Sequence, residues 1–561
     1  MGVSRRNYIL MMGSSQRRSC CSRSSSSSWL VMLVLQLLVL MFQLVAFMGL
    51  QKGVEAQGSW EIVQNNAGIS SMHTAVTNYG TVVLLDRTDI GPSQLPLPDG
   101  VCRNDANDET STVDCTAHSA IFDPVSGTIR PLFIQTDTWC SSGQFDAGGT
   151  LVQTGGDNDG FSKIRTFSPC AADGDCNWVE TTTPLQNGRW YATNQRLPDG
   201  SQVVVGGRST STLEYVPANG APLFLDLISN TNDAQNDNLY PYVHLLPNNQ
   251  LFIFANRDSI LFDWTTNSVV GNLPTIPGEP RNYPSAGSSA MLPLSGFNGW
   301  TDPEILVCGG ATYGAYLNVA AEMPASISCG RIAPLSATPA WAMEDMPLRR
   351  NMGDMVLLPD RTVLILNGAA NGAQGWGNAQ NPVLTPVLYT PTAAPGTRFQ
   401  SLTATQIPRV YHSTANLLPD GRVLVAGSNT HQFYTLTGDL PTELRIEAFS
   451  PPYLSGTQPS INNPPNTFPY GSTYAFSISG GNPNLIEINM LSAPFTTHSF
   501  SQGQRLLQLQ TTVPVVDFFG AYTVTATAPP NAVIAPSAYY MLFAVSQGIP
   551  SQASWVHVGN N

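Results

Sequence analysis

Residues 189–207 read RWYATNQRLPDGSQVVVGG, and residues 409–428 read RVYHSTANLLPDGRVLVAGS. Both stretches begin with a polar lead-in, pass through a few apolar residues to a Pro-Asp-Gly turn, and continue as a β-branched run followed by glycine. An Asp-Gly turn tolerates positive φ and joins two antiparallel strands without splaying them. The phrase therefore predicts a β-hairpin.

The same phrase returns, less regularly, along much of the chain. The looser copies are SMHTAVTNYGTVVLLD from Ser71, WCSSGQFDAGGTLVQTGG from Trp139, YPYVHLLPNNQLFIFAN from Tyr240, RNMGDMVLLPDRTVLILNG from Arg350, and an interrupted copy, YPSAGSSAMLPLSG from Tyr283 continuing to EILVCGG at Glu304. Their mean spacing of roughly 55 residues is close to the kelch period of about 50. Seven copies predict an all-β fold, a seven-bladed kelch-like β-propeller over residues 57–440. An array of β-sandwiches is the alternative, but it does not explain one phrase in one register.

After the last copy the composition changes. Stretches such as YGSTYAFSIS, INMLSAPFTTHSF and AYTVTAT are short, alternate between apolar and polar residues, and are separated by Pro and Gly. This pattern is typical of an Ig-like β-sandwich of about 100 residues. We therefore expect a second domain over residues 441–561.

Residues 1–56 differ from both regions, with five arginines, a serine run and then an apolar stretch over residues 29–50. This order predicts a signal peptide, with cleavage after the small residues that end at Ala56. The alternative is an uncleaved anchor, because the apolar stretch is long enough to span about 30 Å of hydrocarbon. In either case we expect the remainder outside the cytosol, secreted to the extracellular space or, in a plant, to the cell wall or apoplast.

The charge balance narrows the partners. The whole chain has 25 basic and 38 acidic residues, a formal charge of −13, and the first 56 residues hold six of those basic residues and one of the acidic ones. The rest of the chain is strongly acidic, so nucleic acid is not an expected partner, because a nucleic-acid-binding protein needs a basic surface.

A membrane is a partner only if the first segment stays uncleaved, and a monomer is expected. With no Asn-x-Ser/Thr sequon, N-glycosylation is not expected.

The cysteines predict three disulfides and one free thiol. Seven of the nine follow the first segment, and cysteines tend to pair in an oxidising compartment. The natural local bridges are Cys102 with Cys115, Cys170 with Cys176, and Cys308 with Cys329. Cys140 is left over, and a free extracellular thiol needs a reason.

The register of the repeat places Cys140 at a position that carries unusual side chains in other copies. In three copies the residue nine places before the turn glycine carries unusual chemistry: Cys140 before Gly149, Tyr191 before Gly200, and His412 before Gly421. Equivalent positions in different blades of a propeller lie at similar radius and height about its axis. A thiol, a phenol and an imidazole are therefore predicted to converge.

At these residues the chain resembles the copper-radical oxidases, in particular the glyoxal oxidase branch that is related to galactose oxidase, and the resemblance covers residues 57–561. The motifs that carry it are Trp139-Cys140, Gly188-Arg189-Trp190-Tyr191, Arg409-Val410-Tyr411-His412, and Thr497-His498-Ser499-Phe500 followed by Gln504-Arg505. None of these motifs is specific alone; their combination is.

The resemblance implies a role for each site residue. Cys140 and Tyr191 are expected to form a thioether that stabilises a tyrosyl radical, a Tyr-Cys cofactor made by the protein itself. Tyr191, Tyr411, His412 and His498 are expected to bind Cu(II), with Tyr411 also acting as the general base. Two imidazoles and phenolate oxygens suit tetragonal Cu(II) better than tetrahedral zinc. His498 comes from the C-terminal domain, so that domain must reach the propeller axis.

The implied activity is oxidation of a small aldehyde, such as glyoxal or methylglyoxal, by O2 and water to a carboxylic acid and hydrogen peroxide. Two alternatives stay open, a galactose or primary-alcohol oxidase with the same copper centre and a non-catalytic wall-binding propeller. His73 is a further candidate, as a residue that tunes the radical. Trp139 and Trp190 are interpreted as packing residues beside the axis.

Overall fold

The computed structural model describes residues 57–518 and 520–559, so the predicted signal peptide lies outside the described residues. The described chain is built from β-strands, short 3-10 turns and one short α-helix, α2 (Asp226–Asn230). The prediction of an all-β protein is confirmed. Within the described ranges no helix is both long and apolar enough to cross a bilayer.

The two clearest copies of the repeated phrase fold as predicted. Residues 189–207 contain β12 (Thr193–Arg196) and β13 (Gln202–Val205), paired antiparallel around the turn. Residues 409–428 contain β31 (Ser413–Leu417) and β32 (Val423–Gly427) in the same arrangement. Gly200 has φ 90° and Gly421 has φ 88°, values that a side chain would strain.

The other five copies form equivalent pairs. They are β2 (His73–Val76) with β3 (Val82–Leu85), β8 (Ser142–Phe145) with β9 (Leu151–Thr154), β16 (Tyr242–Leu245) with β17 (Leu251–Ala255), β20 (Gly287–Met291) with β22 (Ile305–Gly309), and β25 (Asp354–Leu357) with β26 (Val363–Leu366). Each of the seven pairs lies in a separate sheet, and two further strands extend that sheet on the side of the pair's second strand. Six of these extensions are β6 (Ser119–Phe122) and β7 (Ile129–Leu132), β10 (Ile164–Phe167) and β11 (Trp178–Glu180), β14 (Thr212–Val216) and β15 (Leu223–Phe224), β18 (Asp258–Asp263) and β19 (Ser268–Asn272), β23 (Ser328–Ile332) and β24 (Ala342–Asp345), and β29 (Val387–Tyr389) and β30 (Phe399–Ser401).

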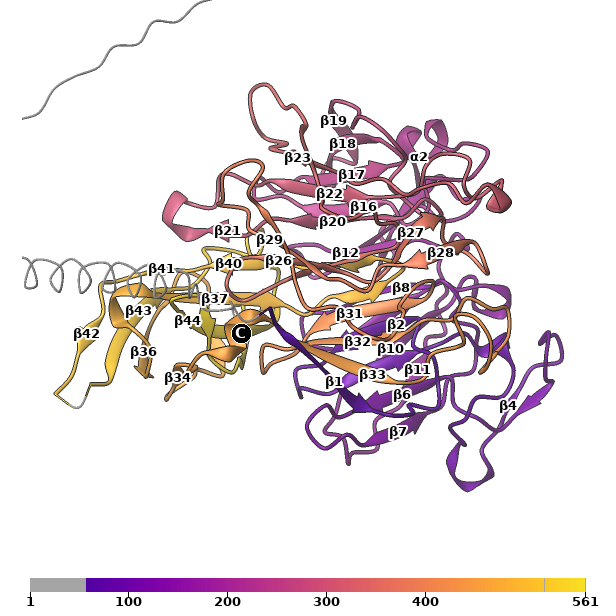
Figure 1. Ribbon diagram of the computed structural model, residues 1–561, viewed down its shortest axis with the longest axis horizontal. Helices are drawn as coiled ribbons and strands as arrows, with labels where there is room; N and C mark the ends of the chain where they lie inside the picture. Colours follow the sequence, from indigo (N-terminus) through magenta and orange to yellow (C-terminus); the bar gives the residue numbers. More distant parts are fainter. Residues whose placement is uncertain (1–56, 519, 560–561) are drawn as a thin grey trace, which may run out of the picture. The chain divides into compact units, whose positions relative to one another are not determined.

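The seventh sheet is completed by the start of the described chain. Its outer strands are β33 (Ile446–Ser450) and β1 (Ser59–Gln64), which pair antiparallel from Ser59 opposite Ser450. Figure 1 shows β1 beside β33, although nearly 400 residues separate them in the sequence. The first described strand thus joins the last repeat.

In four of the repeats a buried arginine connects the strands to the lead-in. The Nη1 atom of Arg189 donates to the Gly206 carbonyl (2.7 Å), and that of Arg409 donates to the Gly427 carbonyl (2.8 Å). The guanidinium charges are balanced by Glu214 and Glu447, whose side chains are at most 4 % exposed. Arg281 and Arg350 make the same kind of bond in two other sheets. The arginine of the phrase is therefore structural.

The C-terminal region contributes two more sheets. One contains β37 (Ile486–Ser492), β44 (Ala538–Ser546), β46 (Ser554–Val558), β40 (Leu506–Gln508), β35 (Thr467–Phe468), β45 (Ile549–Pro550) and, from the repeats, β21 (Leu294–Ser295); the other contains β34 (Ser460–Ile461), β36 (Thr473–Ser479), β43 (Tyr522–Thr527), β41 (Gln510–Thr511) and β42 (Val515–Val516). Their facing side chains share one core, which includes Phe476, Val524 and Leu542.

One hairpin of the C-terminal region does not belong to these two sheets. Strands β38 (Phe495–Thr497) and β39 (Phe500–Gln502) pair with each other, and β38 extends the sheet of the first repeat by pairing with β2. The hairpin contacts the first strand of every repeat: β2, β8, β12, β16, β20, β25 and β31. A single hairpin can touch all seven strands only if they surround it.

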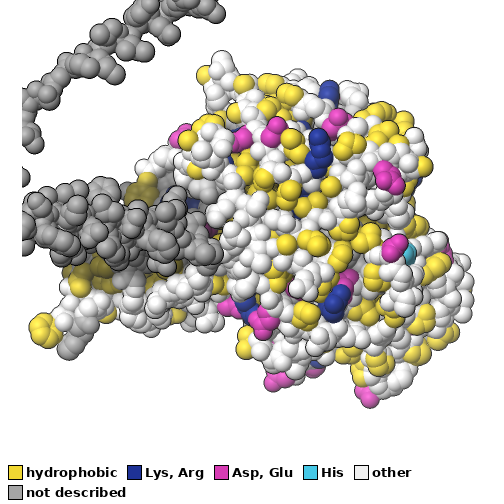
Figure 2. All heavy atoms as spheres, viewed as in Figure 1, with side chains coloured by type: hydrophobic (Ala, Val, Ile, Leu, Met, Phe, Trp, Pro, Cys, Tyr) yellow, Lys and Arg dark blue, Asp and Glu magenta, His cyan; other side chains and the backbone are white. Residues whose placement is uncertain are grey.

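The three predicted disulfides are present, namely Cys102–Cys115, Cys170–Cys176 and Cys308–Cys329. Cys140 is free and buried, as expected. Charged side chains are sparse on the face that Figure 2 shows, in line with a composition of 11 % charged residues.

Replacing Arg409 by Met leaves the Glu447 carboxylate buried without its partner, so we expect the free energy of unfolding to fall by about 3–5 kcal/mol. The matched control is Arg361→Met, because the Arg361–Glu487 pair is about one-third exposed and such pairs contribute about 1 kcal/mol or less. Equilibrium denaturation of both variants measures the difference. Equal losses would show that the buried pair has no special weight.

Candidate active site

One position just before the first strand of six repeats has a left-handed backbone. These residues are Cys140 (φ 51°), Tyr191 (66°), Tyr240 (49°), Ala286 (43°), Met352 (42°) and His412 (65°). Non-glycine residues adopt this conformation at a cost of about 1–3 kcal/mol, and they do so mainly at functional sites.

Backbone hydrogen bonds connect these equivalent residues from sheet to sheet. The Tyr191 amide donates to the Cys140 carbonyl (2.9 Å), the Tyr240 amide to the Tyr191 carbonyl (2.9 Å), and the Met352 amide to the Ala286 carbonyl (2.6 Å). These bonds bring Cys140 and Tyr191 together, and His412, which occupies the equivalent position in its own repeat, lies beside Cys140.

His498 reaches the same centre at the tip of the β38–β39 hairpin. Thr497 pairs with Phe500, and the two residues of the turn, His498 and Ser499, have φ 45° and 69°. Positive φ at both positions is the pattern of type I′ hairpins, which favour Asn-Gly. Thr497 Oγ1 lies 2.6 Å from His498 Nδ1, so the second ring nitrogen, Nε2, faces Cys140 Sγ at 3.2 Å.

A thiol and two imidazoles form the polar cluster at this centre. The sulfur of Cys140 and one ring nitrogen from each of His412 and His498 lie within 4.8 Å of one another, and all three residues are buried. The rings of His412 and His498 are 4.9 Å apart, and Tyr411 stacks on His412 at 3.8 Å.

Three phenols lie beside this cluster in a chain of hydrogen bonds. Tyr283 Oη is 3.2 Å from Tyr191 Oη and 3.2 Å from Tyr411 Oη. The rings of Tyr191 and Tyr283 stack with their centroids 4.4 Å apart. All five residues predicted for the site are thus brought together, and Tyr283 is an additional member that the sequence did not identify.

Burial controls the ionisation of these groups. It raises the pKa of the Cys140 thiol and of the Tyr191 and Tyr411 phenols well above their usual values. It lowers the pKa of His412 and His498 well below the usual value, with the neighbouring histidines adding to the effect. At neutral pH the protein alone therefore holds protonated phenols and neutral imidazoles, whose nitrogens have lone pairs to offer.

The residues present fit a copper ion. Both ring nitrogens of His412 are buried and have no hydrogen-bond partner among the described residues. Buried polar atoms without partners are rare, and a metal ligand is one explanation. Neutral imidazoles together with phenol oxygens are a donor set for Cu(II), whereas structural zinc sites use Cys and His without phenols.

Comparison with known proteins agrees with this site. Residues 72–453 match the family model described as the glyoxal oxidase N-terminus, and residues 458–558 match the galactose oxidase-like Early set domain. The chain is 54 % identical to aldehyde oxidase GLOX of Vitis pseudoreticulata, over 89 % of this chain and 97 % of that protein. The chain belongs to the glyoxal oxidase family.

This glyoxal oxidase family member is also similar to other oxidases. It is 41 % identical to aldehyde oxidase GLOX1 of Arabidopsis thaliana, over 89 % of this chain and 84 % of that protein. Its identity with galactose oxidase of Gibberella zeae is 24 %, over 78 % of this chain and 63 % of that protein. A solved fungal alcohol oxidase in complex with copper has the same fold, with a TM-score of 0.70 at 18 % identity and coverage of 90 % of this chain and all of that one.

Tryptophans lie next to the buried cluster of this family member. The ring of Trp190 lies 4.7 Å from that of Tyr191, Trp139 lies 5.0 Å from Trp190, and Trp376 stacks on Trp139 at 5.2 Å. All three are half-buried. Trp376, in the loop between β27 (Ala369–Gly372) and β28 (Ala379–Pro382), was not identified from the sequence because it lies outside the repeated phrase.

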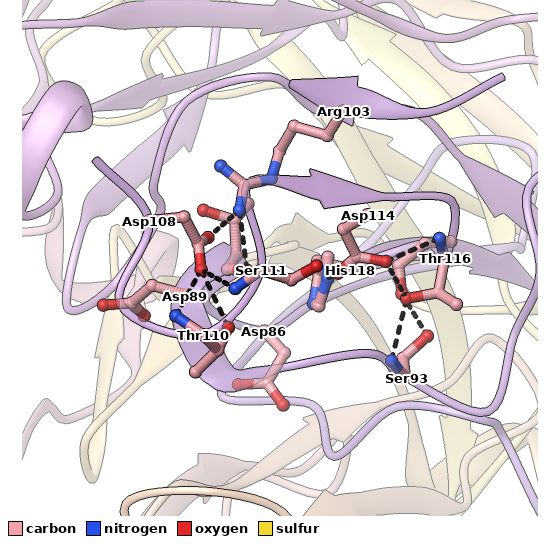
Figure 3. A network of polar contacts seen from close by, with 12 residues as sticks. Asp86, Asp89, Ser93, Arg103, Asp108, Thr110, Ser111, Asp114, Thr116 and His118 are labelled. Atoms are coloured by element: carbon pink, nitrogen blue, oxygen red, sulfur yellow. Dashed lines mark hydrogen bonds and ion pairs between the residues drawn. The ribbon is translucent and has the colours of Figure 1, made fainter. Parts of the chain in front are cut away.

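The loop that follows β3 places an arginine against these rings. The Arg87 guanidinium lies 4.4 Å from the centre of the Trp139 ring and 5.1 Å from that of Trp376. Figure 3 shows the polar network farther along this loop. There Arg103 pairs with Asp108, and its Nη2 donates to the Thr88 carbonyl (3.1 Å).

Two further features hold the same loop. Its short strands β4 (Arg103–Asn104) and β5 (Val113–Asp114) pair with each other, and the Cys102–Cys115 disulfide lies at their ends. His118 Nε2 lies 2.9 Å from Asp114 Oδ2 (Figure 3). The loop that carries Arg87 is therefore cross-linked by a disulfide, a short strand pair and buried polar contacts.

His73 lies next to the cluster without belonging to it. Its Nε2 is 3.0 Å from the Thr138 carbonyl and 3.2 Å from Ser141 Oγ, two groups that flank Cys140. Burial lowers the pKa of His73 to about 3, so the ring is neutral. Its predicted influence on the radical stays a prediction.

Proposed function

We propose that this chain is a secreted copper-radical oxidase that converts an aldehyde, O2 and water into a carboxylic acid and hydrogen peroxide. The observation that carries the proposal is the convergence of Cys140, Tyr191, Tyr411, His412 and His498 at one buried centre. Relatives named aldehyde oxidase are 54 % and 41 % identical to the chain, against 24 % for galactose oxidase. This difference favours an aldehyde over galactose as the substrate.

Each residue has a definite task in this proposal. Tyr191, Tyr411, His412 and His498 hold Cu(II), and Cys140 forms a thioether with the Tyr191 ring. Forming that C–S bond removes one hydrogen from the thiol and one from the ring, and O2 takes up both as hydrogen peroxide. Bound copper supplies a one-electron acceptor next to Tyr191, which completes the pair that a two-electron oxidation needs.

The chain's own residues then handle protons and hydrogen. The aldehyde reacts as its hydrate, and Tyr411 accepts the proton from one hydroxyl of that hydrate as general base. The Tyr191 radical takes the hydrogen atom from carbon. The hydrate thereby loses two protons and two electrons to become the acid, and O2 gains them to become hydrogen peroxide. Burial of Tyr191, which is 3 % exposed, shelters the radical from solvent.

The domain plan belongs to the proposal. The seven sheets form a seven-bladed kelch-like β-propeller over residues 57–440, with β33 completing the last sheet just beyond. Residues 441–561, apart from β33 and the β38–β39 hairpin, form an Ig-like sandwich. One hairpin in contact with all seven first strands supports the propeller. Three disulfides support export to the oxidising extracellular space. Removal of residues 1–56 and a monomeric state are further parts of the proposal.

The central test is peroxide release from purified, copper-loaded protein offered glyoxal, methylglyoxal, galactose and a simple primary alcohol. We expect peroxide with the aldehydes and none from Tyr191→Phe, which lacks the ligand oxygen. A preference for the alcohols would favour the alcohol-oxidase alternative. No peroxide from copper-bound protein with any substrate would indicate a wall-binding propeller instead.

Copper affinity tests the imidazole ligands. We expect His412→Ala and His498→Ala each to weaken Cu(II) binding by more than about 100-fold, because the loss of even an outer partner of a ligand costs about 10–100-fold. Calorimetric titration measures the affinity. His557→Ala is the control, because that half-buried ring bonds to the Ala147 carbonyl (3.1 Å); an equal loss there would contradict the assignment.

The thioether is tested by Cys140→Ser, which keeps a small buried side chain. We expect the variant to fold and bind copper but to form no stable radical. Copper loading in air should lower the intact mass of the wild type by two hydrogen atoms relative to its mass before loading, and should leave that of Cys140→Ser unchanged. A turnover rate equal to that of the wild type would refute the thioether.

A further inference from the structure

Tyr283 occupies a singular place in the site. It precedes β20, its side chain is 7 % exposed, and its hydroxyl bridges Tyr191 Oη and Tyr411 Oη at 3.2 Å on each side. These are the two oxygens to which the proposed function gives the radical and the general base. A substrate oxygen on the Tyr283 side of Tyr411 therefore has the Tyr283 hydroxyl beside it.

The chemistry of the substrate leaves one group without a partner. An aldehyde hydrate has two hydroxyls on its reacting carbon, and the proposed mechanism uses only one of them. A primary alcohol has a single hydroxyl there. A buried hydroxyl that finds no hydrogen bond costs about 1–3 kcal/mol, so a hydrate needs a second partner that an alcohol does not need.

Two neighbouring hydroxyl groups already have hydrogen-bond partners. Tyr240 Oη donates to the Ser141 carbonyl (3.0 Å), and Thr497 Oγ1 lies 2.6 Å from His498 Nδ1. Among the described residues, the Tyr283 hydroxyl bonds to the other two phenols alone, and the proposed function assigns both of these to reaction with the substrate. Its phenol can both donate and accept, and it stays protonated near neutral pH as tyrosines ordinarily do.

We propose that the Tyr283 hydroxyl binds the second hydroxyl of the aldehyde hydrate and so makes this site select hydrates over primary alcohols. The inference rests on the proposed function and adds a residue that determines specificity. A site built to hydrogen-bond a substrate hydroxyl discriminates against an analogue that lacks it, because its own polar group is then left unpaired.

The kinetic test compares Tyr283→Phe with the wild type on methylglyoxal and hydroxyacetone, which differ only at the reacting carbon. Phe keeps the ring that stacks on Tyr191 and removes only the hydroxyl. We expect kcat/KM for methylglyoxal to fall about 10- to 100-fold and that for hydroxyacetone to change less than about threefold. An equal fall with both substrates would overturn the proposal, because the hydroxyl would then act through Tyr191 or Tyr411.

Tyr242→Phe is the matched control. Tyr242 is a buried tyrosine on β16, and its hydroxyl donates to the Arg281 carbonyl, away from the three phenols. This variant should keep the wild-type ratio of the two kcat/KM values. A change of ratio as large as that in Tyr283→Phe would show that any buried hydroxyl has the effect, and would overturn the proposal.

A binding test needs no turnover. Trifluoroacetone hydrate has two hydroxyls and no hydrogen on the central carbon, and trifluoro-tert-butanol has a methyl group in place of one hydroxyl. Titration of copper-loaded protein, followed by tryptophan fluorescence and by the copper EPR signal, should show the hydrate binding at least about tenfold tighter to the wild type. The two ligands should bind equally to Tyr283→Phe. Equal binding to the wild type, or a preference retained in the variant, would overturn the proposal.

The two levels of inference fail separately. If the wild type releases no peroxide from any substrate, the proposed function is wrong. If it oxidises aldehydes but Tyr283→Phe keeps both the kinetic and the binding preference, only the role of Tyr283 is wrong. If hydroxyacetone is oxidised too slowly to measure, the binding preference alone decides.

Discussion

The structure depends on the left-handed residues that precede the first strand of the repeats. A residue with positive φ turns the chain sharply into the strand, and at Tyr191 the amide and the carbonyl then bond to the equivalent residues of two other sheets. The bond from Tyr191 to Cys140 and the bond from Tyr240 to Tyr191 are parts of this system. The residues at this one position supply backbone bonds between sheets and also the thiol, phenol and imidazole side chains. The fold and the site therefore depend on the same residues.

This construction explains how much of the site could be predicted from the sequence. The offset of nine residues from the turn glycine identified Cys140, Tyr191 and His412, since a tight turn fixes the number of residues between it and the start of the strand. The same offset leads from Asn249 to Tyr240, which was missed because asparagine, with φ 67°, replaces glycine in that turn. Three disulfides were predictable because their partners are close in sequence.

Other parts of the site follow from packing that no local pattern records. Tyr283 lies in the interrupted copy and three residues before the equivalent position, so no offset leads to it. Trp376 and Arg87 belong to loops whose conformations depend on long-range contacts, such as the stacking of Trp376 on Trp139. His498 was identified by its motif, but the approach of its hairpin to the seven first strands is visible only in the folded chain.

The pairing of β1 with β33 and the insertion of the β38–β39 hairpin have a consequence for biosynthesis. As the chain emerges from the ribosome, the last repeat sheet has all its strands only after residues 446–450 have appeared. The imidazole of His498 follows about 50 residues later. Synthesis runs from the N-terminus onward, so the residues that carry the thiol and the phenols are made before the second imidazole. His498 is therefore the last residue of the centre to be synthesised, and a chain that ends before the β38–β39 hairpin lacks it.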